Sequence, residues 1–363
     1  MPDEEIGDPA ASFVTARPCD SNLGSAASFA QARSFFETCL GHDNCTPPAI
    51  KFVPSRVIDT DNETGPRLRV TRAGEDIFEY LALSYVWGME QTYVTTNDTL
   101  GDKSDHLDIS QLPQTILDAI EVTRKLGFRF LWVDSLCIVQ DSKEDKRREI
   151  SQMRSIFRHA TLTIAAGNAC TVADGFLTEP DLQWFMTPFK IPFRCPDSQS
   201  GTVSVGCKSY YEHRKDPLNS RAWTFKEELL SPRVLQYSYD GLRWLCNTQR
   251  LANRDLPGPP QLELLASPSE QPTEGPERDK REDLLTLWSD ILGEYTQRNL
   301  THAEDKLVAF AAIAEAFHEI WGDEYLAGLW RKDLARGLMW SMTVDQKKLT
   351  PAGFRVAPIS MRT

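Results

Sequence analysis

Between residues 78 and 170 the chain alternates short, almost wholly apolar runs with segments of helical periodicity. The apolar runs lie at 80–87, 130–139 and 161–166, and the helical segments lie at 112–126 and 142–160. A run that is apolar throughout is typical of a strand buried on both faces of a parallel sheet. Right-handed crossovers are the simplest connections between such strands. This feature predicts an α/β fold with a parallel sheet flanked by helices.

The ends of the predicted helices carry recognisable signals. Pro113 suits the first turn of the helix at 112–126, and Gly127 suits the position just past its end. Ser142, followed three residues later by Asp145, predicts a capped start for the next helix. These signals support the prediction that strands and helices alternate in this segment.

Later parts of the chain add a hairpin and a helical region. Asp240 and Gly241 separate apolar runs at 234–239 and 242–246, which is a strong signal for a β-hairpin, here an insertion. Six of the 22 prolines lie in 255–282, which predicts a loop or linker. The predicted divisions are a flexible N-terminal segment at 1–34, an α/β domain at 35–254, the linker at 255–282, a helical region packed on the domain at 283–345, and a tail at 346–363.

Charge and hydropathy exclude several classes of protein. Among the 363 residues, 52 Asp and Glu outnumber 40 Lys and Arg, so the net charge is −12 and we expect no nucleic acid as a partner. No apolar run reaches the ~20 residues that span a bilayer, so we expect no membrane span. The acidic start MPDEEIGDPA does not resemble a signal peptide, and the eight cysteines are expected to be reduced thiols in the cytoplasm.

Cys39, His42 and Cys45 form a compact trio of soft metal ligands, with Cys19 as a conceivable fourth. The spacing lacks the two Cys pairs that make a zinc ribbon convincing. We therefore interpret the segment as a plain loop with a buried thiol and predict no metal site. The chain also has no phosphate-binding loop, no dinucleotide fingerprint and no nucleophile elbow.

Polar and aromatic residues follow two of the predicted strands. Ser84, Tyr85 and Trp87 end the first strand, and Asp134 and Ser135 follow the core of the second. Ligands of open parallel sheets bind at the carboxyl ends of strands, so these residues are candidates for a binding site. The alternative is structural: the aromatic residues belong to the core, and the carboxylate caps a turn.

A third cluster, RAWTFKEE, lies at 221–228. On a helix, Trp223 and Glu227 share one face, whereas Glu228 points about 100° away and is expected to face solvent. A carboxylate in a cleft can stabilise the cationic transition state of glycosidic cleavage. The alternative is a surface glutamate paired with a nearby cation such as Arg221. Lys226 is expected to lower the pKa of Glu227 and keep it ionised.

Taken together, these motifs resemble the fungal heterokaryon-incompatibility (HET) domain. The resemblance rests on YLALSYVWG (80–88), LPQTILDAIEVTRKLGFRFLWVDSLCIVQD (112–141), IFRHATLTIAA (156–166), DGF (174–176) and SRAWTFKEELLSPRVLQYS (220–238). The flanking segments are similar too, so the resemblance covers about residues 35–340. Lys226 departs from the family pattern, which usually has glutamine before the glutamate.

The resemblance implies a cell-death effector of fungal non-self recognition. HET domains are proposed to be remote relatives of TIR domains, many of which cleave NAD, so a TIR-like or flavodoxin-like sheet is expected. LALSYVW resembles the first TIR strand, and SRAWTFKEEL resembles the segment with the catalytic glutamate, which implies that Glu227 is catalytic. The implied substrate is NAD or a related nucleotide, and no cofactor is required.

The resemblance also suggests roles for the residues around Glu227. Trp223, Tyr85 or Trp87 would wall the nicotinamide, and Arg221 would meet the pyrophosphate. The remaining candidates, which would contact ribose or orient a neighbour, are Ser84, Asp134 and Ser135. The alternative function is a non-enzymatic module that signals by self-association or by recruiting an upstream sensor. A metal-dependent hydrolase using Asp134 and Glu227 is disfavoured, because no carboxylate set has metal-ligand spacing.

Overall fold

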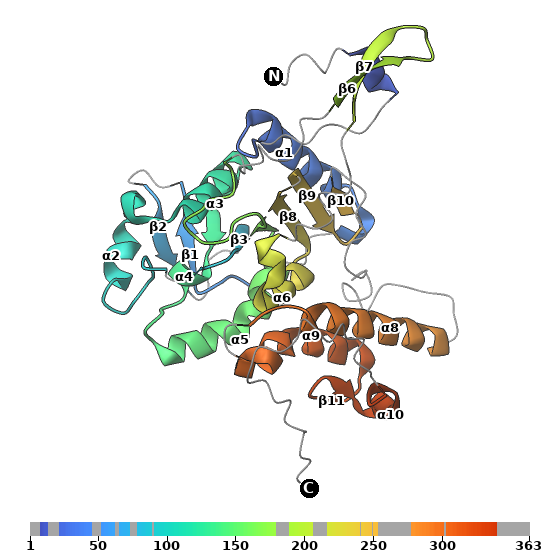
Figure 1. Ribbon diagram of the computed structural model, residues 1–363. Coiled ribbons are helices and arrows are strands. Elements are labelled where there is room, and N and C mark those ends of the chain that lie inside the picture. Colours follow the sequence, from blue (N-terminus) through green and yellow to red (C-terminus); the bar gives the residue numbers. More distant parts are fainter. Residues whose placement is uncertain are drawn as a thin grey trace, which may run out of the picture.

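The computed structural model contains a large mixed sheet covered by helices on both faces, with further helices packed beside it (Figure 1). The residues that it describes are 8–13, 22–45, 52–61, 65–72, 78–88, 91–178, 189–205, 216–239, 241–248, 250–252, 277–300 and 303–339. The predicted N-terminal segment, linker and tail lie partly or wholly outside these residues. No helix in the described ranges is long and apolar enough to cross a membrane.

The main sheet has eight strands in the order β10-β9-β8-β5-β3-β4-β1-β2. Their bounds are β1 Arg56–Asp59, β2 Arg67–Val70, β3 Tyr80–Ser84, β4 Phe130–Trp132, β5 Leu162–Ala166, β8 Arg233–Ser238, β9 Gly241–Cys246 and β10 Arg250–Ala252. The central strands β8, β5, β3 and β4 are parallel, whereas the outer pairings are antiparallel. The prediction of a parallel sheet over residues 78–170 is therefore confirmed, and antiparallel strands from outside that range extend the sheet at both edges.

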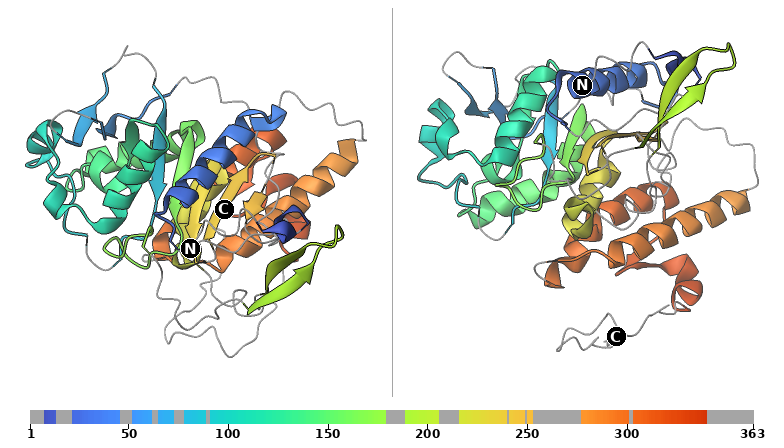
Figure 2. Two further views of the ribbon diagram at one scale, coloured as in Figure 1. Left: turned by 90° about the horizontal axis from the view of Figure 1, so that it is seen from above. Right: turned by 45° about the horizontal axis from the view of Figure 1, so that its top comes forward.

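The four parallel strands follow the spatial order second, first, third, fourth along the chain. The helices that accompany them are α1 Ala26–Leu40, α2 Leu100–Asp105, α3 Gln114–Lys125, α4 Asp134–Cys137, α5 Lys143–His159 and α6 Ala222–Leu230. Helices α1 and α3 cover one face of the sheet, and α5 and α6 cover the other (Figures 1 and 2). Because the order reverses at β3, the connections after β3 and β5 leave the sheet side by side at its carboxyl edge.

The capping signals of the sequence are confirmed. Ser142 accepts a hydrogen bond from the Asp145 amide at the start of α5. Gly127, with φ 85°, adopts the left-handed conformation just after α3. The second predicted strand is wrong in length, because β4 ends at Trp132 and Asp134–Cys137 form the short helix α4. Ser135, Leu136 and Cys137 are buried in that helix, so burial alone did not distinguish strand from helix.

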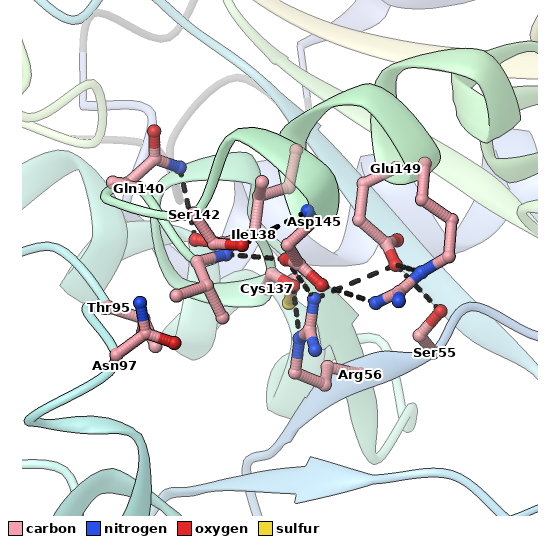
Figure 3. Close-up of polar contacts among 12 residues, drawn as sticks. Ser55, Arg56, Thr95, Asn97, Cys137, Ile138, Gln140, Ser142, Asp145 and Glu149 are labelled. Carbon is pink, nitrogen blue, oxygen red and sulfur yellow. Dashed lines mark hydrogen bonds and ion pairs between the residues drawn. The ribbon is translucent and has the colours of Figure 1, made fainter.

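A buried ion-pair network fixes the start of α5 (Figure 3). The Arg56 guanidinium pairs with Asp145, lies 3.6 Å from a carboxylate oxygen of Glu149 and donates to the carbonyl of Cys137 at 2.6 Å. Ser55 donates to Glu149 at 2.7 Å. Burial raises the pKa of Asp145, but the hydrogen bond from Arg56 and the charges nearby outweigh it and leave the pKa below its ordinary value.

The hairpin predicted at 234–246 is formed by β8 and β9, but it belongs to the main sheet, with β8 parallel to β5. The prediction that it is an insertion is therefore wrong. A separate hairpin, which the sequence did not reveal, is formed by β6 Phe189–Arg194 and β7 Ser200–Val205. It lies at the periphery against the short 3-10 helix η1 Pro9–Ser12 (Figure 1).

The C-terminal region packs on the outer side of α6 (Figures 1 and 2). Its elements are α8 Glu277–Thr296, α9 Lys306–Trp321, β11 Tyr325–Leu326, β12 Leu329–Trp330 and α10 Leu334–Gly337. Ala222, Phe225 and Leu229 of α6 join the hydrophobic cluster of these helices. The opposite side of α6 contacts β3 and β5. Helix α6 is thus shared by two cores, and this shared helix carries Glu227.

Candidate functional site

Helix α6 is positioned at its N-terminus by the segment that follows α8. The Ala222 amide donates to the carbonyl of Asn299 at 2.9 Å, and the Asn299 amide donates to the carbonyl of Ser220 at 2.6 Å. Thr224 caps the same turn, because its hydroxyl donates to the carbonyl of Leu218 at 2.7 Å. These contacts fix where Arg221 and the first turn of α6 lie relative to the sheet.

Glu227 faces the sheet and is only 8% exposed. Ser84, the last residue of β3, lies near enough to lower the pKa of Glu227, and the charges of Asp134 and Arg221 also act on that pKa. Burial raises the pKa of Glu227 to about 7, with a further increase from Asp134, although Ser84, Lys226 and Arg221 lower it. The expectation that Lys226 keeps this carboxylate ionised is therefore wrong, because desolvation outweighs the neighbouring charge.

Lys226 is buried between α6 and α5. Its ammonium lies 4.2 Å from the ring centroid of Trp223 and 3.7 Å from the sulfur of Met153. Burial lowers the pKa of Lys226 to about 8, although the charge of Glu227 opposes that decrease. Glu227 and Lys226 are therefore adjacent residues, each of whose charges acts on the pKa of the other.

Asp134 is held at the end of β4 by two of the predicted site residues. The Trp87 indole nitrogen donates to both of its carboxylate oxygens, at 2.9 and 3.2 Å, and the Ser135 amide donates to one of them at 2.7 Å. Burial raises the pKa of Asp134, and hydrogen bonds from Tyr85 and Trp87 lower it less strongly. The Tyr85 hydroxyl lies 2.9 Å from the Ser135 hydroxyl and 3.0 Å from the side-chain amide oxygen of Gln91.

The structure thus connects most of the residues that the sequence singled out. The connected residues are Ser84, Tyr85, Trp87, Asp134, Ser135, Arg221 and Glu227. Trp223 has different neighbours, because it packs against the cluster of the C-terminal helices. The i, i+4 spacing placed Trp223 and Glu227 on one face of the helix. In the structure Trp223 faces the C-terminal helices, whereas Glu227 faces the sheet.

A small pocket opens beside this group. Ser84, Thr163, Ala165, Leu218, Asn219, Thr224, Glu228, Val234 and Gln236 line it. Its volume is about 10 Å³, which is enough room for about one water molecule. Glu228, expected to face solvent, instead lines this pocket and lies 3.8 Å from Arg298. Gln236 was also missed, and only its polar character within an apolar strand could have marked it.

The buried carboxyl of Glu227 makes stability depend on pH. Its pKa is raised in the folded chain, so folding retains a proton that the unfolded chain loses above about pH 4.5. Stability is therefore expected to fall as the pH rises from about 4.5 to 7. Glu227→Gln removes this loss, and we expect urea unfolding at pH 8 to show the variant about 2 kcal/mol more stable than the parent chain, with little difference at pH 4. Glu315→Gln, at an exposed site on α9, serves as control; a Glu227→Gln effect that is equal at both pH values would contradict the burial argument.

Comparison with known proteins assigns part of the chain to a family. The family model described as heterokaryon incompatibility protein (HET) matches residues 80–227. Searches of curated proteins and of solved structures find no match. The matched segment begins at β3 and ends at Glu227, so it contains every residue of the group assembled above. Residues 80–227 of this chain therefore match the HET domain of heterokaryon incompatibility proteins.

Proposed function

We propose that this chain is a cell-death effector of heterokaryon incompatibility that hydrolyses NAD at its nicotinamide glycosidic bond. The observation that carries the proposal is the position of Glu227, which α6 holds against Ser84 at the carboxyl end of the first parallel strand. Asp134, at the end of the neighbouring strand, is close by. Two carboxyl groups at the carboxyl edge of a parallel sheet are suited to a ligand that develops positive charge.

The proposed chemistry needs few groups. Departure of nicotinamide leaves a cation on the ribose, which the ionised carboxylate of Glu227 would stabilise. Arg221 is suited to the pyrophosphate, because its planar guanidinium matches phosphate oxygens. Trp87 and Tyr85 are engaged with Asp134 and Ser135, so we assign them to orienting the strand ends rather than to stacking on nicotinamide. Trp223 would have to leave the C-terminal helical cluster to meet a substrate.

The strand order supports the TIR-like interpretation. The order second, first, third, fourth agrees with the start of the flavodoxin-like order, in which ligands bind where the order reverses. Here that position lies between the ends of β3 and β5, and Ser84 and Ala165 line the pocket there. Substrate would enter from this edge, next to α6.

The pocket has room for about one water, whereas sites for small ligands measure roughly 300–1,000 Å³. Among the described residues this pocket is therefore closed to NAD, and NAD binding there requires the start of α6 to move. Self-association or an upstream sensor would supply this opening. The same closure favours the second candidate function, a non-enzymatic module whose buried Glu227 is structural.

The test measures NAD loss and nicotinamide release by the purified full chain, at high concentration with a crowding agent. We expect the parent chain and Glu315→Gln to cleave NAD, and Glu227→Gln to be slower by on the order of 100-fold. Activity should rise about tenfold between pH 6 and 8 as Glu227 ionises. Equal cleavage by Glu227→Gln would move the chemistry to another carboxylate, with Glu228→Gln the next variant, and no cleavage by any chain would favour the interaction module.

A further inference from the structure

Four metal-binding side chains converge where α1 meets the β8–β9 hairpin. They are Cys39 in the last turn of α1, His42, Cys45 in the 3-10 helix η2 Asp43–Cys45, and Cys246 at the end of β9. Their ligand atoms all lie within 4.8 Å of one another. The cluster lies outside the group around Glu227 and outside the segment that matches the HET model. We propose that these four residues bind a structural Zn²⁺ ion.

The distances suit a tetrahedral zinc site. His42 Nδ1 lies 3.7 Å from the sulfur of Cys45 and 3.7 Å from the sulfur of Cys246. Zinc–sulfur and zinc–nitrogen bonds of about 2.3 and 2.1 Å at tetrahedral angles place sulfur and nitrogen about 3.6 Å apart. Three Cys and one His form a closed set, which is typical of a structural site rather than a catalytic one.

The surroundings supply a positive charge to balance the metal centre. Zinc with three thiolates carries a net charge of −1. The Arg233 guanidinium, 1% exposed, donates to the Cys39 sulfur at 3.3 Å and to the Cys45 carbonyl. Its remaining contacts are with the Thr161 carbonyl and the Phe36 ring, and no carboxylate of the described residues pairs with it. A buried guanidinium needs a compensating negative charge, which a zinc–thiolate centre provides.

Register and hydrogen bonds fix the fourth ligand. Cys246 lies directly opposite Arg233 in the β8–β9 pair, so both side chains project from the same face of the sheet, toward α1. The Thr248 hydroxyl lies 3.4 Å from the Cys45 sulfur, and the Asn247 side chain donates to the Asn44 carbonyl at 3.1 Å. The ligand segments are thus already held together by the fold.

The sequence prediction of a plain loop rested on the lack of the two Cys pairs that are typical of a zinc ribbon. The trio from 39 to 45 was visible, but Cys246 lies about 200 residues later and only the fold brings it near. Cys19, considered as a fourth ligand, lies outside the described residues. The proposed ion would tie the start of the chain's fold to the hairpin that extends the central sheet.

The test determines metal content in the full chain, purified under reducing conditions without chelator. We expect about one zinc per chain, and replacement by Co²⁺ should produce a thiolate-to-cobalt charge-transfer band with the visible bands of tetrahedral Co²⁺. Cys246→Ser should lose most of the bound zinc, whereas Cys170→Ser, at an exposed cysteine far along the chain, should keep it. His42→Cys preserves four ligands and should retain zinc even if Cys246→Ser fails to fold.

Three outcomes would overturn the proposal. The first is a folded, reduced parent chain that contains no stoichiometric metal and takes up neither Zn²⁺ nor Co²⁺. The second is a disulfide between two of the three cysteines Cys39, Cys45 and Cys246, detected by mass analysis of a chain prepared under reducing conditions. The third is zinc that survives Cys246→Ser undiminished, which would place the ion elsewhere. None of these readouts depends on NAD cleavage.

Discussion

Arg56→Leu is expected to lower the free energy of unfolding by about 3–5 kcal/mol, because it removes the buried cation that two buried carboxylates share and leaves them only the solvent-exposed Arg148. Asp145 and Glu149 are 7% and 0% exposed, and both lie within ion-pair distance of Arg56. The substitution also removes the donor to the Cys137 carbonyl, which joins α4 to the start of α5. Denaturant unfolding monitored by tryptophan fluorescence and circular dichroism measures the loss.

Arg148 provides a matched control, because it contacts the same two carboxylates from the solvent side. Its side chain is 53% exposed, so Arg148→Leu is expected to cost about 1 kcal/mol or less. The folded pKa of Asp145 is depressed, so the stability gained from its ionised form is present above about pH 4 and is lost as the pH falls further. Equal losses for Arg56→Leu and Arg148→Leu at neutral pH would refute the role of burial.

Trp288→Ala is expected to destabilise the C-terminal helices by about 3–5 kcal/mol. The indole is 5% exposed, and its ring contacts four other aromatic rings at centroid distances of 4.9–6.0 Å. Those rings belong to Phe310, Phe317, Tyr325 and Trp330. Truncation therefore leaves a cavity at the centre of the second core, where several elements meet.

Hydrogen exchange measures the destabilisation caused by Trp288→Ala and also shows which elements it affects. Trp288→Ala should increase exchange in α8 and α9 first and then in α6, because Phe225 and Leu229 of α6 belong to the same cluster. Val308→Ala, at a site on α9 that is 52% exposed, should change stability by less than about 0.5 kcal/mol. If exchange in α6 stays unchanged while α8 and α9 open, the two cores are independent and α6 is held by the sheet alone.

The central sheet was predictable because local signals and tertiary burial agree there. The apolar runs that became β3 and β5 are buried throughout, and Ser142 caps α5 as its sequence position indicates. The prediction failed where a buried segment could form either a strand or a helix. After Trp132 the chain forms the buried helix α4 instead of continuing as a longer strand. The edge strand β2 was a weak signal, because it alternates arginine with apolar residues.

The candidate site shows what sequence reasoning can and cannot supply. The strand-end residues were singled out from their places in the chain, because parallel strands bring their carboxyl ends to one edge. Glu227 was singled out by the resemblance of its segment to the TIR segment. The raised pKa of Glu227 could not be predicted from the sequence. The charge of Lys226 is visible there, but the desolvation of Glu227 can be judged only from the packed structure. Cys246 was missed for a related reason: its partners at 39–45 lie on a distant segment.

The boundaries of the HET match have a practical consequence for the fold. The matched segment ends at Glu227, inside α6, and excludes β1 and β8, which pair with β4 and β5. Excising residues 80–227 would expose an unpaired strand on each side of a three-stranded remnant and the apolar outer face of a truncated helix. The family signature is therefore a recognition feature of the sequence rather than an autonomous folding unit, and a cloning boundary drawn at its limits would favour aggregation.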